Sequence, residues 1–182
     1  MKMACVGIQG RGETDRFIAR VATALSAAGL RLAGTVQVNT DRPGRRKCDM
    51  ELRVLPDGPR VRISEDRGAL ARGCILDSAA LEQTVVEVME RLSEADFLIV
   101  NKFGKREGEG RGMVPVIAAA LDRGLPVLVG VNALNLPDFL SFAGGLAVTL
   151  PANVAGVTEW CLGQCPAAAT RGAAGPGLAA SG

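Results

Sequence analysis

Apolar residues recur along the chain in two patterns, short uninterrupted runs and helical spacings, up to about residue 162. Short apolar runs bounded by glycine or polar residues favour buried strands, and apolar residues three or four apart favour helices. The runs predict strands at Ala4–Ile8, Leu30–Val38, Phe97–Val100, Leu125–Val131 and Leu146–Leu150. The helical spacings predict helices at Asp15–Ala28, Asp77–Ser93, Met113–Arg123, Leu136–Phe142 and Val154–Leu162.

This alternation of strands and helices predicts a three-layer α/β fold, in which helices cover both faces of a mostly parallel sheet. One segment departs from it, because Met50–Leu55 and Arg60–Ser64 alternate apolar and polar residues around a Pro-Asp-Gly-Pro turn. That pattern predicts an inserted antiparallel hairpin. Between these elements we expect loops at Thr40–Lys47, Glu65–Gly73 and Asn101–Gly112.

The length of 182 residues favours a single domain, which we assign to residues 1–165. Residues 166–182 are rich in Ala, Gly and Pro and predict a disordered tail. No apolar run approaches the roughly 20 residues that span a bilayer, and the N-terminus lacks the apolar core of a secretion signal. We therefore expect a cytoplasmic protein without a membrane partner, whose cysteines are thiols.

Composition excludes several chemistries. The chain has no His, which excludes Ser-His-Asp and Cys-His catalysis and His-ligated zinc. Aromatic residues make up 3% of the chain and the formal net charge is +2, so we do not expect a nucleic-acid partner. The partner class that remains is a small anionic ligand.

A glycine-rich loop between the first predicted strand and helix is the clearest candidate site. A phosphate loop in that context reads Gly-x-x-x-x-Gly-Lys-[Ser/Thr], and here the segment is Gly7-Ile8-Gln9-Gly10-Arg11-Gly12-Glu13-Thr14. Its backbone N–H groups and the following helix N-terminus suit an anion, but Glu13 stands in place of the lysine. At about 4 Å from a phosphate charge a carboxylate costs roughly 4 kcal/mol at an effective dielectric of 20. A triphosphate should therefore bind poorly unless Arg11 or Lys102 supplies the missing cation, and a simple glycine turn is the structural alternative.

The end of the strand Phe97–Val100 is the second candidate position. Phosphoryl-transfer enzymes of this kind place an Asp there to hold Mg²⁺, whereas this chain continues with Asn101 and Lys102. Glu13 thus stands where a phosphate loop has its lysine, and Asn101 and Lys102 stand where acids are expected. We expect Glu13 and Lys102 to form an ion pair if the two loops adjoin at the carboxyl ends of the sheet.

The glycine loop, together with the later segment Ile99-Val100-Asn101-Lys102-Phe103-Gly104-Lys105, resembles the two signatures of the small P-loop nucleoside-triphosphatases, the cancer-related or thermostable group. The resemblance covers about residues 3–162 and implies a P-loop NTPase-like domain that binds nucleotide. It places the binding residues at Gly7, Gly10, Arg11, Gly12, Glu13, Thr14, Asn101, Lys102 and Lys105. The changes at Glu13, Asn101 and Lys102 predict a degenerate member with weak or absent hydrolysis and weak or no Mg²⁺ binding.

Other stretches are similar to an uncharacterised proteobacterial branch, whose members are often encoded near molybdate-transport genes. They are Cys48-Asp49-Met50, Ser64-Glu65-Asp66-Arg67-Gly68, Arg72-Gly73-Cys74, Asn101–Lys105 and Val131-Asn132-Ala133-Leu134-Asn135. This likeness implies a link to molybdate or another oxyanion.

Two cysteines and a basic stretch fit such an oxyanion. Residues 42–72 hold nine Lys or Arg against five Asp or Glu, and arginine suits bidentate oxyanion binding. Cys48 and Cys74 lie beside arginines, which favour a reactive thiolate. A split metal site of Cys48, Cys74 and Cys161 is one interpretation of the cysteines, and small, partly buried thiols are the other. For the arginines the alternative is a solvated face of the hairpin. Cys5 is predicted to lie in the core. Asn132 and Asn135 either line the ligand crevice or cap the helix that begins at Leu136, and capping is the role we expect of Asn135.

Three functions follow from these observations. The first is a degenerate P-loop NTPase-fold protein that binds a nucleotide or phosphate-like anion at Gly10–Thr14 with little hydrolysis. The second is an accessory protein for molybdenum or another oxyanion, which would use the arginine-rich segment with Cys48 and Cys74. The third is an active nucleoside-triphosphatase in which Lys102 or Arg11 replaces the usual lysine. The sequence favours a protein that is not an enzyme and leaves protein partners open.

Overall fold

Parallel strands form the centre of the molecule and helices cover both of their faces. The computed structural model describes residues 2–41, 48–65 and 75–165. The strands are β1 (Met3–Val6), β2 (Leu32–Asp41), β3 (Cys48–Val54), β4 (Arg60–Arg62), β5 (Ser64–Glu65), β6 (Ile75–Leu76), β7 (Phe97–Phe103), β8 (Val127–Val131) and β9 (Ala147–Thr149). The helices are α1 (Glu13–Ala27), α2 (Ser78–Arg91) with the 3₁₀ turn η1 (Leu92–Glu94), α3 (Lys105–Gly108), α4 (Val114–Asp122), α5 (Leu136–Ala143) and α6 (Val154–Gly163).

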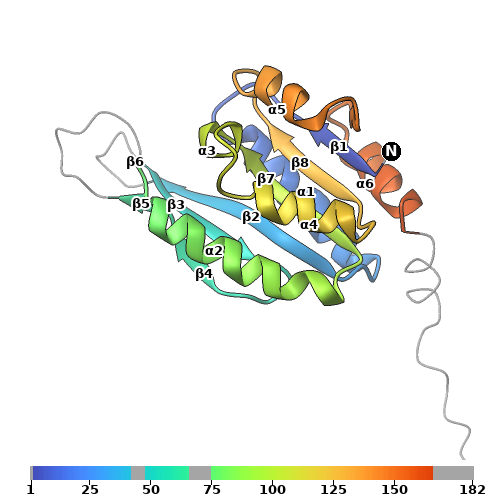
Figure 1. Ribbon diagram of the computed structural model, residues 1–182, viewed down its shortest axis with the longest axis horizontal. Coiled ribbons are helices and arrows are strands. Elements are labelled where there is room, and N and C mark those ends of the chain that lie inside the picture. Colours follow the sequence, from blue (N-terminus) through green and yellow to red (C-terminus); the bar gives the residue numbers. More distant parts are fainter. Residues whose placement is uncertain (1, 42–47, 66–74, 166–182) are drawn as a thin grey trace, which may run out of the picture.

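Seven strands form one sheet in the order β4-β3-β2-β7-β8-β1-β9 (Figure 1). The strands β2, β7, β8, β1 and β9 run parallel to one another, whereas β3 and β4 are antiparallel to their neighbours and form one edge. Strands β5 and β6 pair separately as a second, two-stranded sheet. The three-layer α/β prediction is confirmed, and so is the antiparallel hairpin at its edge.

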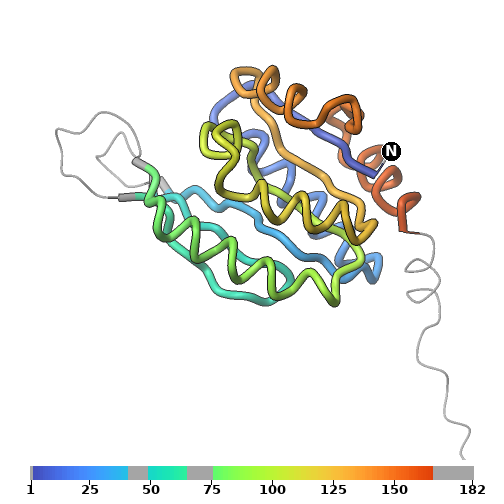
Figure 2. Tube along the Cα trace, viewed as in Figure 1, coloured from blue at the N-terminus to red at the C-terminus, as the bar shows by residue number. Residues whose placement is uncertain are grey.

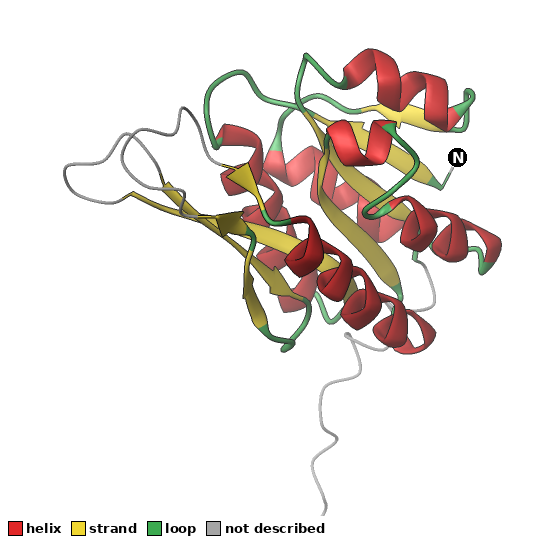
Figure 3. Cartoon of the chain, turned by 60° about the vertical axis from the view of Figure 1, so that its left-hand side comes forward, coloured by secondary structure: helices red, strands yellow, loops and turns green. Residues whose placement is uncertain are grey.

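The two faces of the sheet are covered by different pairs of helices. One apolar cluster joins β1, β2 and β7 to α1 and α6, through residues such as Ile18, Leu25 and Val157. The other lies beneath α2 and α4 and includes Val88, Ile117 and Leu98. The path of the chain in Figure 2 and the side view in Figure 3 show α2 and α4 together on one side of the sheet. Burial of these two stripes is what holds the layers together.

The prediction for the segment after Val100 was wrong. A loop was expected over Asn101–Gly112, but β7 continues to Phe103 and α3 follows at Lys105–Gly108. The continuation is favoured because Phe103 is fully buried, and its ring packs edge-on against Phe139 with centroids 5.3 Å apart. Strand β7 reaches this position through an irregular register with β8, in which Phe103 faces Val131.

Two helix starts compare differently with their predictions. The Asp77 side chain caps α2 and accepts the N–H groups of Ala79 and Ala80 at 3.0 Å, as the sequence predicted. Asn135 does precede α5, but its side chain makes no capping hydrogen bond. Asn135 occupies the predicted N-cap position of α5, while its own N–H is accepted by Asn132 Oδ1 at 2.9 Å, and both residues line the cleft at this edge of the sheet. Within the described ranges, every helix is too short or too polar to cross a bilayer.

Candidate functional site

The glycine loop joins the carboxyl end of β1 to the N-terminus of α1, as its sequence position predicts. Gly12 is the N-cap of α1 and has φ +74°, a left-handed conformation that favours glycine. Glycine has no side chain to accept a hydrogen bond from the first N–H groups of the helix. Among the described residues, the backbone N–H groups of Gly12, Thr14 and Asp15 have no hydrogen-bond acceptor. Three amides at the positive end of a 15-residue helix therefore remain available to an anion.

The Thr14 hydroxyl is used within the loop itself. It accepts the Ile8 N–H at 3.0 Å and lies 3.2 Å from the Ile8 carbonyl oxygen, to which it can donate. These contacts tie the start of the loop to the first turn of α1. Gly130 of β8 allows this packing, because a Cβ there would lie 3.1 Å from Thr14 Cγ2 and 2.1 Å from the Asn101 carbonyl oxygen. Thr14 and Asn101 thus meet over Gly130.

Glu13 contacts a cation on its own helix and not on β7. Its Oε1 accepts a hydrogen bond from Arg16, three residues later, and the two form a partly exposed ion pair. The ion pairs found within residues 2–41, 48–65 and 75–165 do not include one between Glu13 and Lys102. The predicted Glu13–Lys102 pair is therefore wrong. Helical spacing explains the outcome, because residues three apart lie on the same side of a helix.

Asn101 is buried and faces a carboxylate that the sequence analysis did not single out. Its Nδ2 donates to Asp15 Oδ1 at 2.9 Å, and its Oδ1 accepts the Gln37 N–H at 2.8 Å. Asp15 Oδ2 accepts Asn39 Nδ2 at 2.7 Å and, more weakly, Gln37 Nε2 at 3.4 Å. We call Asp15, Gln37, Asn39 and Asn101 the Asp15 cluster. It joins α1, β2 and β7 directly beside the glycine loop.

The Asp15 cluster places an acid in contact with Asn101, the residue at the position where an Asp was expected from the sequence. Asp15 is only 8% exposed, although carboxylates are seldom buried without partners. One signal in the sequence could have found it: Asp15 precedes Ile18, Ala22 and Leu25 at helical spacing and so falls on the buried face of α1. A carboxylate in an apolar stripe requires donors, and the amide side chains of Gln37, Asn39 and Asn101 supply them here.

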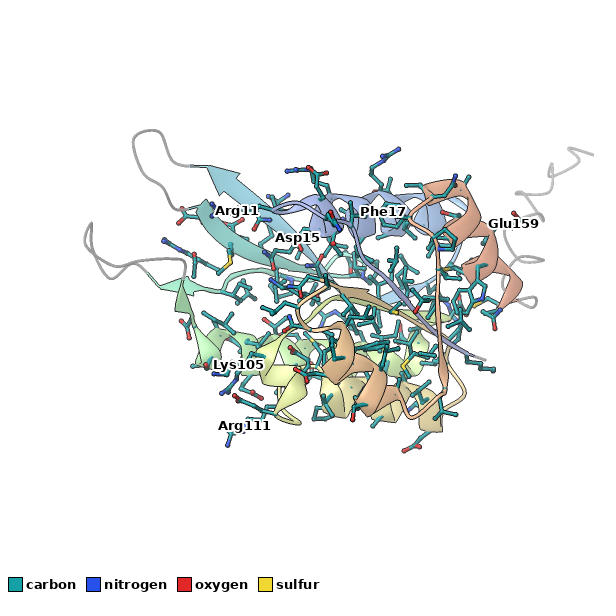
Figure 4. All side chains as sticks on the ribbon, turned by 90° about the horizontal axis from the view of Figure 1, so that it is seen from above. Arg11, Asp15, Phe17, Lys105, Arg111 and Glu159 are labelled. Carbon is teal, nitrogen blue, oxygen red and sulfur yellow. The ribbon has the colours of Figure 1, made fainter. Side chains whose placement is uncertain are left out.

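The candidate binding residues fall into two groups. Gly7, Gly10, Arg11 and Gly12 lie in the loop before α1, and Glu13 and Thr14 are the first two residues of that helix. Lys102 is an exposed residue of β7, and Lys105 begins α3 with its Nζ 4.0 Å from Glu109 Oε1. Figure 4 shows Arg11 and Asp15 on the α1 side of the sheet, and Lys105 and Arg111 on the side of α2 and α3. The structure therefore does not bring Lys105 to the glycine loop.

Cys5, Cys161 and Cys165 are buried thiols. Cys161 is fully buried among the residues between α1 and α6, and burial raises the pKa of its thiol to about 12. Cys5 lies in the core strand β1, as predicted, and burial raises its pKa also. The split site of Cys48, Cys74 and Cys161 stays a prediction. Cys48 begins β3, while Cys74 and most of the arginine-rich segment lie outside the described residues.

Two hollows open at the carboxyl side of the sheet. A cleft of about 400 Å³ lies between the hairpin strands, the end of β7 and α2, with Gln37 and Asn101 in its wall. A smaller hollow of about 230 Å³ adjoins the start of the glycine loop at Gly7, Ile8 and Gln9, and also contacts Val131 and Thr149. Ligands of open α/β sheets bind at this edge.

Comparison with known proteins supports this fold. The structure superposes on the crystal structure of THEP1 from Aquifex aeolicus with a TM-score of 0.64 and 17% identity, over 91% of this chain and 99% of that one. A solution structure of a human cancer-related nucleoside triphosphatase gives a TM-score of 0.47 at 14% identity, over 83% and 77% of the two chains. The superposition on THEP1 shows that the domain has the α/β fold of that protein.

One curated relative is more similar in sequence. A molybdenum import ATP-binding protein, ModC 2 of Bradyrhizobium diazoefficiens, is 30% identical over 160 residues, which are 87% of this chain and 18% of that protein. The chain thus corresponds to less than one fifth of that relative. A family model described as a protein of unknown function, DUF2478, matches residues 3–160, and the chain belongs to that family.

Proposed function

We propose that this protein binds a nucleotide or another phosphate-like anion at the loop Gly7–Thr14, and that it hydrolyses nucleotide weakly or not at all. The observation that carries the proposal is the set of unpartnered N–H groups of Gly12, Thr14 and Asp15 at the start of α1. Amides fixed by a helix start need no rearrangement to meet an anion, and the helix dipole favours negative charge there. The small hollow beside Gly7 leaves space next to the loop.

Weak hydrolysis follows from the side chains around these amides. Phosphoryl transfer in this fold class uses a lysine on the phosphates, a Ser or Thr hydroxyl on Mg²⁺ and an Asp on the neighbouring strand. Here Glu13 contacts Arg16, the Thr14 hydroxyl contacts the Ile8 backbone, and Asn101 contacts Asp15. Asp15 is the acid that contacts Asn101, but both of its oxygens already accept hydrogen bonds from amide side chains. The loop thus keeps its backbone donors and lacks the usual side-chain chemistry.

Calorimetry tests this proposal directly. ATP, GTP and inorganic phosphate are titrated with and without Mg²⁺, and phosphate release is measured on the same samples. We expect measurable anion binding that changes little with Mg²⁺, and only trace turnover. Tight triphosphate binding with sustained Mg²⁺-dependent turnover would instead support an active nucleoside-triphosphatase, and no binding of any of the three would contradict the proposal.

The variant Glu13→Lys sharpens the experiment. It replaces a repulsive carboxylate with the cation that phosphate loops use, so we expect nucleotide affinity to rise by about tenfold or more. Glu159→Lys is the matched control, since it makes the same charge change on exposed α6, which Figure 4 shows at the far end of the molecule. Unchanged or lower affinity in Glu13→Lys would show that Glu13 points away from the anion.

A tetrahedral oxyanion such as molybdate is the second candidate ligand. The similarity to part of a molybdenum import ATP-binding protein favours it, and molybdate has the charge and shape that a phosphate cradle accepts. The test compares melting temperatures with molybdate, tungstate, sulfate and phosphate, because a ligand that binds only the folded state raises the melting temperature. Metal analysis of protein from molybdate-fed cells completes it. No bound molybdenum and no shift with molybdate or tungstate would exclude this candidate.

The roles proposed for Cys48 and Cys74 are tested in the same assay. A Cys48→Ser, Cys74→Ser double variant should lose a molybdate-dependent shift if these thiols contact the ion. Because phosphate does not bond to thiols, its shift should persist in that variant. Equal shifts in the variant and the wild type would assign the oxyanion to the glycine loop alone.

A further inference from the structure

The cleft of about 400 Å³ is separate from the glycine loop and has a chemistry of its own. It opens on the α2 side of the sheet, and its lining includes residues of β2, β3, β7 and α2 but none of Gly7–Thr14. Its volume falls within the range of about 300–1,000 Å³ that is typical of sites for small organic ligands.

The floor of the cleft is apolar. Leu52, Leu81 and Met113 line it and are each less than 7% exposed, and Met50 and Ile63 extend the same surface. These side chains belong to the hydrophobic cluster beneath α2 and α4 or pack against it, so the floor is fixed by the fold. An apolar floor that is already shaped favours the uncharged body of a ligand.

The rim of the cleft is cationic. Lys102, Lys105 and Arg106 line it, and both lysines are exposed. Glu107 is also in the wall, but its carboxylate is buried and accepts the N–H groups of Gly104 at 2.9 Å and Met113 at 3.1 Å. These amides hold the Glu107 carboxylate in the wall, and the charged lining residues are three cations and one anion, so the net formal charge of the lining is positive.

Arg106 is incompletely partnered at this rim. Its Nε is buried without a hydrogen-bond partner in the described part of the chain, and its only ion pair there places an Nη atom 3.7 Å from Glu82 Oε1. A buried guanidinium N–H without an acceptor is costly, and an anionic ligand group supplies the strongest acceptor for it. One N–H donor at the rim, that of Arg106 Nε, is thus left without a hydrogen-bond acceptor beside the apolar floor.

We propose that this cleft is a second ligand site, which binds a small organic anion with an apolar ring or chain on the floor and its negative group against Lys102, Lys105 and Arg106. The site does not depend on anion binding at the glycine loop. The cleft adjoins the Asp15 cluster, because Gln37 and Asn101 line the cleft and also belong to that cluster.

The experiment uses a pair of fluorescent probes with similar ring systems. 8-Anilinonaphthalene-1-sulfonate carries an apolar body with one negative charge, and N-phenyl-1-naphthylamine lacks the charge. We expect the sulfonate to bind the folded protein one to one, and about tenfold more tightly than the uncharged probe. Circular dichroism of every sample is recorded, because the sulfonate also binds partly folded states. Equal affinities would contradict the cationic rim, and no binding of either probe would contradict the site.

Two variants locate the probe. Asn135→Trp introduces a bulky ring at a lining residue whose side chain caps nothing, and it should weaken the sulfonate by about tenfold. Its control is Val86→Trp on the exposed side of α2. Lys105→Glu with Arg106→Gln should lower affinity for the sulfonate but not for the uncharged probe, with the exposed Arg20→Glu of α1 as control. Unchanged binding in both cleft variants would overturn the proposal.

Competition separates this site from the proposed anion cradle. Saturating inorganic phosphate, which has no ring for the apolar floor, should leave the sulfonate bound, whereas one-to-one displacement would mean that the probe occupies the glycine loop and would overturn the second site. The result is independent of the proposed function. A protein that binds no nucleotide or phosphate at all can still bind the probe in the cleft.

Discussion

Asp15 and Glu107 are both buried acids near the carboxyl edge of the sheet, and they are held in different ways. Glu107 accepts only backbone N–H groups of its own loop. They belong to Gly104, three positions earlier in the chain, and to Met113, six positions later. Asp15 accepts side-chain amides from residues 22, 24 and 86 positions away. One acid shapes a loop locally, and the other joins three elements of the fold.

The difference shows which acid belongs to the site. The contacts of Glu107 fix the turn between β7 and α4, and a loop of this kind can be satisfied by its own backbone. The contacts of Asp15 depend on α1, β2 and β7 being assembled. A carboxylate whose two oxygens accept amide side chains from two strands stabilises the assembled edge of the sheet.

Replacing Asp15 by Ala should have the largest effect. The change leaves three buried amide side chains without their shared acceptor, which is expected to lower the free energy of unfolding by about 3 kcal/mol. Urea denaturation followed by the fluorescence of Trp160, the single tryptophan, measures it. A loss below about 1 kcal/mol would mean that the cluster rearranges or that water replaces the carboxylate.

Glu107→Ala should cost less, about 2 kcal/mol, since two backbone N–H groups lose their acceptor in a partly exposed loop. The sharper readout is where protection is lost. Hydrogen exchange should increase in residues 104–113 and remain unchanged at the start of α1, whereas Asp15→Ala should affect α1, β2 and β7 together. Equal patterns in the two variants would remove the distinction between a local and a connecting acid.

Exchanging the acid and amide of the Asp15–Asn101 pair tests whether the carboxylate can sit on either element. Asn101→Asp alone places two carboxylates in contact, and Asp15→Asn alone places two amides there, so each should destabilise. The double variant restores one acid and one amide, and a double-mutant cycle should give a favourable coupling of about 1 kcal/mol or more. Additive effects would show that the surroundings, and not the pair, decide which residue carries the charge.

The double variant also carries a functional readout. It returns an acid to the end of β7, where phosphoryl-transfer enzymes use one for Mg²⁺. Nucleotide binding should therefore depend on Mg²⁺ more strongly than in the wild-type protein, measured by the same calorimetry. No change in the Mg²⁺ dependence would show that the position of the acid does not limit metal binding.

Much of the fold could be predicted because each main element has its own local pattern. Apolar runs marked the buried strands β7 and β8, and the helical stripe of α1 and the cap of α2 at Asp77 were also found. The extension of β7 could not be predicted in this way. It depends on the ring of Phe103 packing against Phe139, a contact between residues 36 positions apart that no local pattern reveals.

The sequence predicted the position of the glycine loop, but it did not predict which side chains contact Glu13 and Asn101. Glycine spacing located Gly7–Thr14 because a turn of that kind has a sequence signature. The partners of Glu13 and Asn101 depend on which side chains face each other, and spacing along the chain does not give this. Charge alone suggested Lys102 for Glu13, whereas the helix brings Arg16 closer. Asp15 was overlooked although it interrupts the apolar face of α1.

Glu13→Gln provides the smallest effect and the reference for the comparison. Glu13 lies in the same first turn of α1 as Asp15, but its side chain is 46% exposed and its partner Arg16 is 65% exposed. Exposed ion pairs contribute little because water and salt screen both charges, so the free energy of unfolding should fall by less than about 0.5 kcal/mol. Denaturation at low and high salt measures this, with Asp15→Asn alongside. If Glu13→Gln destabilised as much as Asp15→Asn, burial would not be what separates the two acids. If it leaves stability unchanged and strengthens nucleotide binding, Glu13 acts on the ligand and not on the fold.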